Sequence, residues 1–433
     1  MKTTHRTIGL LAGGALLLGA SLAVGQDWPQ WRGPNRDAKA TGFTAPKPWP
    51  KELTQKWKTA VGSGDATPAL VGNKLYVFAR QEADEVTRCL DAGTGKELWL
   101  DKNAVPAING PDAAVHGGPR SSPAVANGKV FTLGVSGTVS CLDAATGKML
   151  WRKDDFPGAW PRFHLAISPI VVDGLCIVQL GKETEGAIVA YDVATGDQKW
   201  KWTEEGPGYA SPAVLTVAGT KMIVTLTAKS IVGISVTDGR LLWQAPFVPQ
   251  GMNYNAATPI VDGPTVIYCG AGRGAKAVKI EKQGDSFAAK ELWSNPDNAV
   301  QFNTPLLKGS ALFGLSARND FFCLNTQDGK TAWTAPFAPP APAAEGQGQG
   351  PGGMRGGRGI GRTAGYGSIV DGGSVLLALT PASQLVAFEA NEKAFTELAR
   401  IKVADTPTYA HLVVSGKRLF VKDQDSVTLW TLD

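Results

Sequence analysis

One eleven-residue segment recurs along the chain, and this repetition limits the fold more than any other feature. The copies read CLDAGTGKELW at 89–99, CLDAATGKMLW at 141–151, AYDVATGDQKW at 190–200, GISVTDGRLLW at 233–243 and CLNTQDGKTAW at 323–333. Each copy predicts an apolar strand, a tight turn and a returning strand. Because one such hairpin cannot bury its own apolar face, the copies are expected to pack side by side.

Three positions of the segment have a predicted structural role. The aspartate accepts hydrogen bonds from N–H groups of the turn, and the glycine supplies a positive φ. The tryptophan packs against an adjacent sheet. The residues assigned to these roles are Asp91, Gly95, Asp143, Gly147, Asp192 and Gly196, with Trp57, Trp99, Trp151, Trp200, Trp243, Trp293 and Trp333.

A second mark sets the period of the repeat. Ser/Thr-Pro pairs open successive units at Thr67, Ser122, Ser168, Ser211, Thr258 and Thr304, and weaker openings follow at Ser368 and near His411. Each opening leads into two short apolar runs and then the hairpin, which gives four strands per unit and is typical of propeller blades. The eighth unit ends after three strands, and residues 52–57, with Trp57, resemble its missing fourth strand. The sequence therefore predicts that residues 52–433 form an all-β, eight-bladed propeller of four-stranded antiparallel blades, in which an N-terminal strand closes the ring.

The N-terminus resembles an export signal. Residues 1–25 combine Lys2 and Arg6 with an apolar run and small residues before a cleavage point. An uncleaved anchor is the alternative, and no cysteine follows for lipid attachment. We therefore expect a periplasmic or secreted protein that does not span the membrane. Its formal net charge falls from +5 to +3 (41 − 38) after cleavage, which does not favour nucleic acid as a partner.

Two segments fall outside the repeat. Residues 26–51 are rich in Trp and Pro and are expected to form an arm packed over the side or mouth of the propeller, with a partner-binding segment as the alternative. Residues 338–366 form a low-complexity Gly/Pro/Arg insert, expected to be a flexible loop; an Arg/Gly tail for an acidic surface is the alternative.

The five cysteines do not predict disulfides or a metal site. Cys89, Cys141 and Cys323 share one position in three blades, whereas Cys176 and Cys269 lie in second strands. Equivalent positions in neighbouring blades are too far apart for a disulfide, so buried thiols are expected. No CxxC or Cys/His cluster indicates metal or haem.

The loops that lead into the inner strands meet at one end of the ring. Polar and aromatic residues precede each inner strand and are expected to line a funnel mouth that binds a cofactor or a partner. They are His116, Arg120, Arg162, His164, Tyr209, Asn253, Tyr254, Asn255, Gln301, Asn303, Tyr366, Tyr409 and His411.

The AxDxxTGKxxW-like hairpin and its surroundings resemble the repeat of pyrroloquinoline quinone (PQQ) enzymes and their non-enzymatic relatives, over about residues 52–433. One branch of this family comprises alcohol and glucose dehydrogenases, which carry PQQ and calcium; the alcohol enzymes add a catalytic Asp and a vicinal disulfide. The other branch resembles the propeller subunit of the outer-membrane β-barrel assembly machinery, a scaffold without chemistry.

This chain departs from both branches. It lacks paired cysteines, and the mouth carboxylates are scattered, although calcium needs several oxygens in one place. It also lacks the lipid-attachment cysteine of the assembly subunit. The favoured prediction is a non-catalytic scaffold or binding module in the cell envelope, a monomeric ring that binds an envelope protein or small molecule at its mouth. The alternative is a PQQ-dependent oxidoreductase with PQQ and Ca²⁺ as cofactors.

Overall fold

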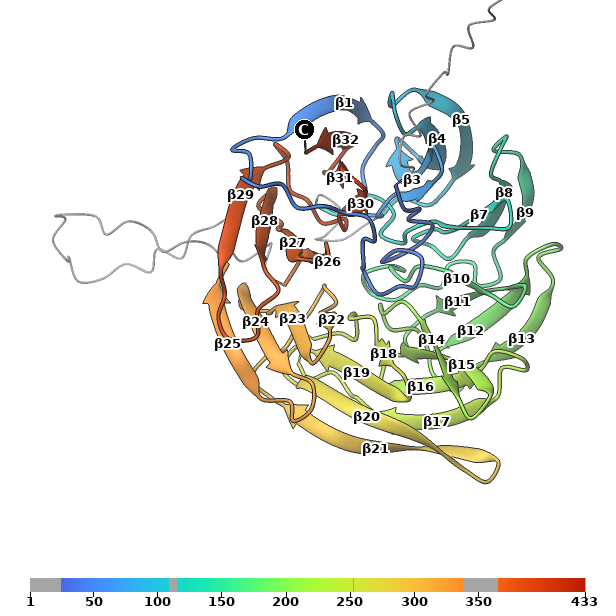
Figure 1. Ribbon diagram of the computed structural model, residues 1–433. Helices are drawn as coiled ribbons and strands as arrows, with labels where there is room; N and C mark the ends of the chain where they lie inside the picture. The colour runs from blue at the N-terminus through green and yellow to red at the C-terminus, as the bar shows by residue number, and fades with distance from the viewer. Residues whose placement is uncertain (1–24, 109–114, 252, 338–364, 433) are drawn as a thin grey trace, which may run out of the picture.

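The computed structural model describes residues 25–108, 115–251, 253–337 and 365–432, and its sheets form the predicted eight-bladed ring (Figure 1). Every blade is a four-stranded antiparallel sheet. The predicted signal peptide and nearly all of the Gly/Pro/Arg insert lie outside the described residues. Within these ranges, no helix has the length and apolar character needed to cross a bilayer.

The strands follow one another from the channel outward in each of the first seven blades. Blade 1 consists of β2 (Ala69–Val71), β3 (Lys74–Gln81), β4 (Asp84–Asp91) and β5 (Glu97–Ala104), and blade 2 of β6 (Ala124–Ala126), β7 (Lys129–Leu133), β8 (Val139–Asp143) and β9 (Met149–Lys153). Blade 3 consists of β10 (Ile170–Val172), β11 (Leu175–Gly181), β12 (Gly186–Asp192) and β13 (Gln198–Trp202), and blade 4 of β14 (Ala213–Val217), β15 (Thr220–Leu226), β16 (Ser230–Ser235) and β17 (Leu241–Pro246). Blade 5 consists of β18 (Ile260–Asp262), β19 (Thr265–Gly270), β20 (Gly274–Gln283) and β21 (Ser286–Asn295). Blade 6 consists of β22 (Leu306–Lys308), β23 (Ala311–Leu315), β24 (Asp320–Asn325) and β25 (Thr331–Pro336), and blade 7 of β26 (Ser368–Asp371), β27 (Val375–Leu379), β28 (Gln384–Glu389) and β29 (Glu397–Lys402).

The two ends of the chain close the ring. Blade 8 consists of β30 (Val413–Ser415), β31 (Arg418–Lys422) and β32 (Ser426–Thr431), and β1 (Thr54–Ala60) supplies its outer strand. Trp57 lies opposite Leu429 and is buried with Phe420 in one core cluster. The prediction that the N-terminal strand closes the ring is confirmed.

The repeated segment holds neighbouring blades together through its tryptophan. The indole N–H of Trp151 donates to the carbonyl of Val193 in the next blade at 3.3 Å, and that of Trp200 donates to Val236 at 2.9 Å. The same relation holds for Trp57, Trp99, Trp293 and Trp333. Trp243 differs, because its N–H faces the sulfur of Met222 in its own blade at 3.2 Å.

The turn glycine has two roles, of which the sequence predicted one. Gly147 and Gly196 have φ of 74°, as expected for the turn. A Cβ at Gly196 would also lie 2.7 Å from the indole of Trp151 in the preceding blade. Asp143 accepts the hydroxyl of Thr146 at 2.7 Å and the N–H groups of Thr146 and Ala145 at 2.8 and 3.1 Å, and these bonds lower the pKa of its carboxyl. The same turn, with an aspartate that accepts backbone N–H groups and a glycine of positive φ, occurs at Asp91 and Gly95 and at Asp192 and Gly196.

Ser/Thr hydroxyls of the openings link several neighbouring blades around the channel. The backbone N–H of Thr67 donates to the hydroxyl of Ser122, Ser122 donates to Ser168, and Ser168 donates to Ser211, at 2.9–3.1 Å. The backbone N–H of Thr258 donates to Thr304 between blades 5 and 6, and that of His411 donates to Thr67 across the junction of blades 8 and 1. These hydroxyls therefore satisfy buried N–H groups at successive blade junctions.

Candidate functional site: the mouth and the channel

The predicted mouth residues lie on the loops that enter the inner strands, and one group of them forms an aromatic cluster. The imidazole of His116 lies 5.3 Å from the ring of Tyr366 and 4.7 Å from that of Tyr409, while Phe302 stacks on Tyr366 at 4.6 Å. Asp65 fixes the imidazole, because its carboxylate lies 2.6 Å from Nδ1. The opposite nitrogen, Nε2, faces the Tyr366 hydroxyl at 3.2 Å.

A second group lies between the openings of blades 3, 4 and 5. The ring of Phe163 meets Tyr254 edge-on at 4.9 Å, and Tyr254 meets Tyr209 at 5.6 Å. The Tyr209 hydroxyl and the backbone N–H of Arg162 both donate to Glu183. Six inter-blade loops thus contribute an aromatic ring to the mouth, and His116 comes from a seventh.

Arg120 connects the two groups. Its guanidinium donates to the carbonyl of Phe163 and, at 3.3 Å, to that of His116. Three buried polar atoms near this arginine have no hydrogen-bond partner among the described residues: Arg120 Nε, Ser121 Oγ and His164 Nδ1. His164 has φ of 63°, and burial, reinforced by Arg120, lowers the pKa of its imidazole. Unsatisfied buried polar atoms and a left-handed non-glycine residue are features that functional sites retain.

Three of the predicted residues do not face the mouth. Asn255 is buried and donates to the carbonyls of Thr227 and Phe247. Asn303 is buried and donates to Leu315 and Gly365. His411 is buried below the mouth, and burial keeps the pKa of its imidazole well below the usual value. Their position before an inner strand correctly predicted that they lie on the mouth loops. Their side chains, however, are buried within or between the blades. Asn253 and Gln301 lie half-buried on their loops.

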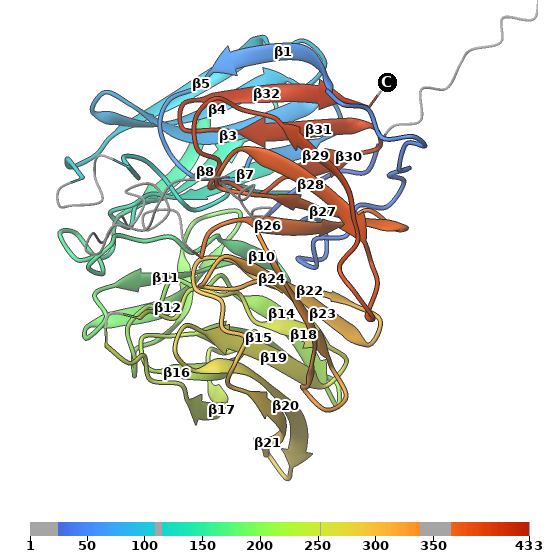
Figure 2. The ribbon, with the colours of Figure 1, turned by 90° about the vertical axis from the view of Figure 1, so that its left-hand side faces the viewer.

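The N-terminal arm closes the channel from the face opposite to the mouth. The sequence had predicted that this arm would pack over the side or the mouth of the propeller. Trp28 pairs with Leu70, and residues 38 and 40 pair with Asp371, at the far ends of inner strands. Figure 2 shows the arm (dark blue) on one face and the loop after β5 on the other. The ring of Trp31 lies 4.0 Å from that of His411 inside the channel.

Two arginine side chains of the arm extend into the channel, a position that the sequence did not predict. The guanidinium of Arg32 donates to the carbonyls of Thr304 and Pro305 at 3.0 and 2.9 Å. That of Arg36 donates to Pro212 at 2.8 Å and to Pro169. Arg32 and Arg36 have φ of 61° and 57°, so the arm turns tightly over the channel. A charged side chain in a Pro/Gly-rich segment gives no signal of burial, although Trp-Arg-Gly-Pro-Asn-Arg concentrates hydrogen-bond donors in a short stretch.

The residues present do not fit calcium and PQQ as the dehydrogenase resemblance implies. Asp65 is engaged by His116, and Glu183 by Arg162 and Tyr209. Across the described ranges, no three His, Cys, Asp or Glu side chains converge as metal ligands. The five cysteines are buried, unpaired thiols in separate blades. The arm also occupies the channel below the mouth.

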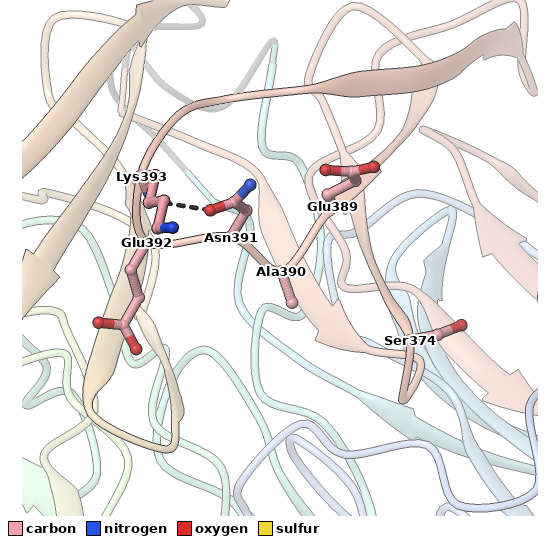
Figure 3. Close-up of a pocket in the computed structure, with 6 residues that line it drawn as sticks. All are labelled: Ser374, Glu389, Ala390, Asn391, Glu392 and Lys393. Carbon is pink, nitrogen blue, oxygen red and sulfur yellow. Dashed lines mark hydrogen bonds between the residues drawn. The ribbon is translucent and has the colours of Figure 1, made fainter.

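A separate surface hollow lies away from the mouth. It measures about 570 Å³ and is lined by Ser374 and residues 389–393, at the hairpin between β28 and β29 (Figure 3). Apart from Ser374, its lining belongs to this hairpin, in which the backbone N–H of Lys393 donates to Asn391 and Glu392 accepts from Ser310. Nothing connects it with the mouth.

Comparison with known proteins identifies the family. The family model described as outer membrane protein assembly factor BamB matches residues 82–335, more than half of the chain. The chain belongs to the PQQ-like propeller family.

Relatives of two kinds occur within this family. The chain is 25% identical to the outer membrane protein assembly factor BamB of Burkholderia pseudomallei over 57% of its length, covering 60% of that protein. It is 32% identical to the quinohemoprotein alcohol dehydrogenase of Comamonas testosteroni over 35% of its length, covering 22% of that protein. The matched part thus spans between about a fifth and three fifths of these relatives.

Solved structures of both kinds share the fold. A europium-containing methanol dehydrogenase matches with a TM-score of 0.69 at 12% identity, over 94% of this chain and 98% of that one. BamB from Moraxella catarrhalis matches with a TM-score of 0.59 at 15% identity, over 88% of this chain and all of that one. At this level of identity the likeness supports the fold alone.

Proposed function

We propose that this protein is a non-catalytic binding module of the cell envelope, which holds a partner protein at the mouth of the propeller. The observation that carries the proposal is the closed channel. Arg32, Arg36 and Trp31 fill it from below, so the mouth is a blind surface. The relatives described as outer membrane assembly factors, together with the predicted export signal, support an envelope location.

The chemistry of the mouth suits a protein partner. Tyr254, Tyr366 and Phe163 are partly exposed, and the guanidinium of Arg162 is exposed beside the Phe163 ring at 5.3 Å. Tyrosine and arginine are enriched among the side chains that contribute most to protein interfaces. Aromatic rings held by one another lose little conformational entropy when a partner binds.

A pull-down of envelope proteins tests this proposal. We expect Arg162→Ala and Tyr254→Ala to reduce capture of the partner by about tenfold or more, the effect of losing an interface side chain of this type. Arg240→Ala, on an exposed turn of blade 4 at the opposite face, is the matched control and should capture normally. Equal capture by all three variants would move the binding surface away from the mouth.

A PQQ-dependent oxidoreductase is the second candidate. The identity of 32% to a quinohemoprotein alcohol dehydrogenase favours it. Dye-linked oxidation of alcohols and sugars, with PQQ and Ca²⁺ added, separates the candidates because only an oxidoreductase reduces the dye. We expect no turnover above the blank. Turnover that Arg120→Ala abolishes would refute the binding-module proposal.

A further inference from the structure

A hollow of about 500 Å³ lies between the N-terminal arm and the inner strands of blades 3 to 6. It opens on the face opposite to the mouth, because the arm pairs with the far ends of the inner strands. Its volume falls in the range of small-molecule sites. It shares no residue with the mouth cluster.

One end of this hollow is cationic. Arg32 and Arg36 line it and are only 2% and 8% exposed. A guanidinium has five N–H donors. Arg32 uses three of its donor atoms on main-chain carbonyls, and Arg36 uses three on two carbonyls and the amide oxygen of Gln30. Each group therefore keeps N–H donors that these bonds do not occupy.

No carboxylate compensates these two charges at ion-pair distance among the described residues. Asp37 lines the same hollow and its charge acts on Arg32, but its ion pair is with Lys39, at 3.6 Å. Burial lowers the pKa of Arg32 to about 10 and that of Arg36 to about 9, so both remain charged at neutral pH. Two buried cations without a carboxylate at ion-pair distance are costly, and an anion bound between them would relieve that cost.

The walls of the hollow are aliphatic. Val171, Val214, Ile260, Val261 and Leu307 line it, and all five are half-buried although they belong to inner strands. They come from four blades and surround the arm from one side. The remaining rim is polar, with Asn35, Lys39 and Asp262 at the surface.

We propose that this hollow binds an amphipathic carboxylate, with its head on Arg32 and Arg36 and an aliphatic body against the ends of β10, β14, β18 and β22. A carboxylate accepts bidentate hydrogen bonds from the fork of a guanidinium. The same chemistry has two sources, a free medium-chain acid or the C-terminal carboxylate of a peptide that ends in aliphatic residues. The site is separate from the mouth and does not rest on the function proposed there.

Calorimetric titration of the full chain with octanoate, hexanoate, octylamine and octanol tests the site. We expect saturable binding of octanoate, about fourfold weaker for each methylene removed, and none of octylamine. A peptide ending in Val-Leu, compared with its C-terminal amide, tests the second source: tighter binding than octanoate, lost on amidation, identifies the peptide. Equal binding of octanoate and octylamine would overturn the proposal, as would no saturable binding of any carboxylate.

Variants locate the site. Val261→Gln and Leu307→Gln should each weaken octanoate by about tenfold, since each removes apolar contact area without touching an arginine. Leu398→Gln, at a partly exposed position on β29, is the matched control and should bind like the parent. Arg36→Gln should abolish binding, and the two wall variants keep the test valid if that change unfolds the chain. Unaltered binding in both wall variants would place the ligand elsewhere, and loss in Arg162→Ala would place it at the mouth.

Discussion

The two ends of the channel are built in different ways. At the arm end, arginine side chains donate to main-chain carbonyls of blades 3, 4 and 6, which are fixed by the sheets. At the mouth, most contacts join side chains of different loops, such as His116 with Tyr366 and Phe163 with Tyr254. Main-chain partners do not change when a blade side chain is substituted, whereas a contact between two loop side chains is lost when either one is substituted. From this contrast we infer that the arm end mainly stabilises the ring, whereas the mouth is the proposed site of recognition.

The largest expected effect comes from removing the arm together with the closing strand. Deletion of residues 26–58 exposes the edge of β32, opens the channel and removes Trp28 and Trp57 from the core. We expect the deleted chain to lose cooperative unfolding, because the edge of β32 and a core cluster become exposed at once. Thermal circular dichroism of both chains measures this. A deleted chain that melts like the parent would contradict the ring closure.

Replacement of repeat tryptophans by alanine tests the contacts between neighbouring blades, which lie between the two ends of the channel. Trp151→Ala should lower the free energy of unfolding by about 3–5 kcal/mol, because it empties a site between blades 2 and 3. Trp200→Ala should behave similarly. Denaturant unfolding is the measurement, with Leu98→Ala at a half-exposed position as the control. A loss below about 1 kcal/mol in both tryptophan variants would mean that the indoles do not bridge the blades.

A matched pair of arginine variants compares the two ends directly. Arg36→Met should cost about 2–4 kcal/mol, since the carbonyls of Pro169 and Pro212 would lose charged donors in a buried place. Arg162→Met, at the mouth, should change the free energy of unfolding by less than about 0.5 kcal/mol. Denaturant unfolding compares the two variants. Equal losses would remove the distinction between the ends.

Much of this structure was predictable because the chain repeats it. The turn residues and the tryptophans encode the blade locally, so their roles follow from residue type and period. The position of Arg32 and Arg36 was not predictable, since their partners are carbonyls that lie far away in the sequence and have no signature. The mouth was predictable only to the level of loops: Asn255 and Asn303 precede inner strands, as Tyr254 does, yet their amides point into the blades.

The smallest expected effect is a pH dependence at the junction of blades 1 and 2. Glu85 is 2% exposed and accepts the N–H of Val135, and burial raises the pKa of its carboxyl to about 7. The folded pKa lies above the unfolded value of 4.5. The stability that Glu85 contributes is therefore complete below pH 4.5 and declines as the pH rises to about 7. Glu85→Gln should remove this decline, worth about 1–3 kcal/mol between pH 4.5 and 8.

Melting curves of the parent and Glu85→Gln across this range check the prediction. Asp143→Asn is a useful control, because that carboxyl is exposed and its pKa is lowered rather than raised. If the parent and Glu85→Gln kept parallel profiles, the Glu85 carboxyl would not titrate within the folded protein in this range.

The central proposal is that the mouth above the closed channel binds a partner protein rather than PQQ. Titration of the purified protein with PQQ in the presence of Ca²⁺, followed by absorbance and by melting temperature, tests it most directly. We predict no saturable change in absorbance and an unchanged melting temperature. Saturable binding of one PQQ per chain, with a rise in melting temperature that Arg120→Ala removes, would contradict the claim.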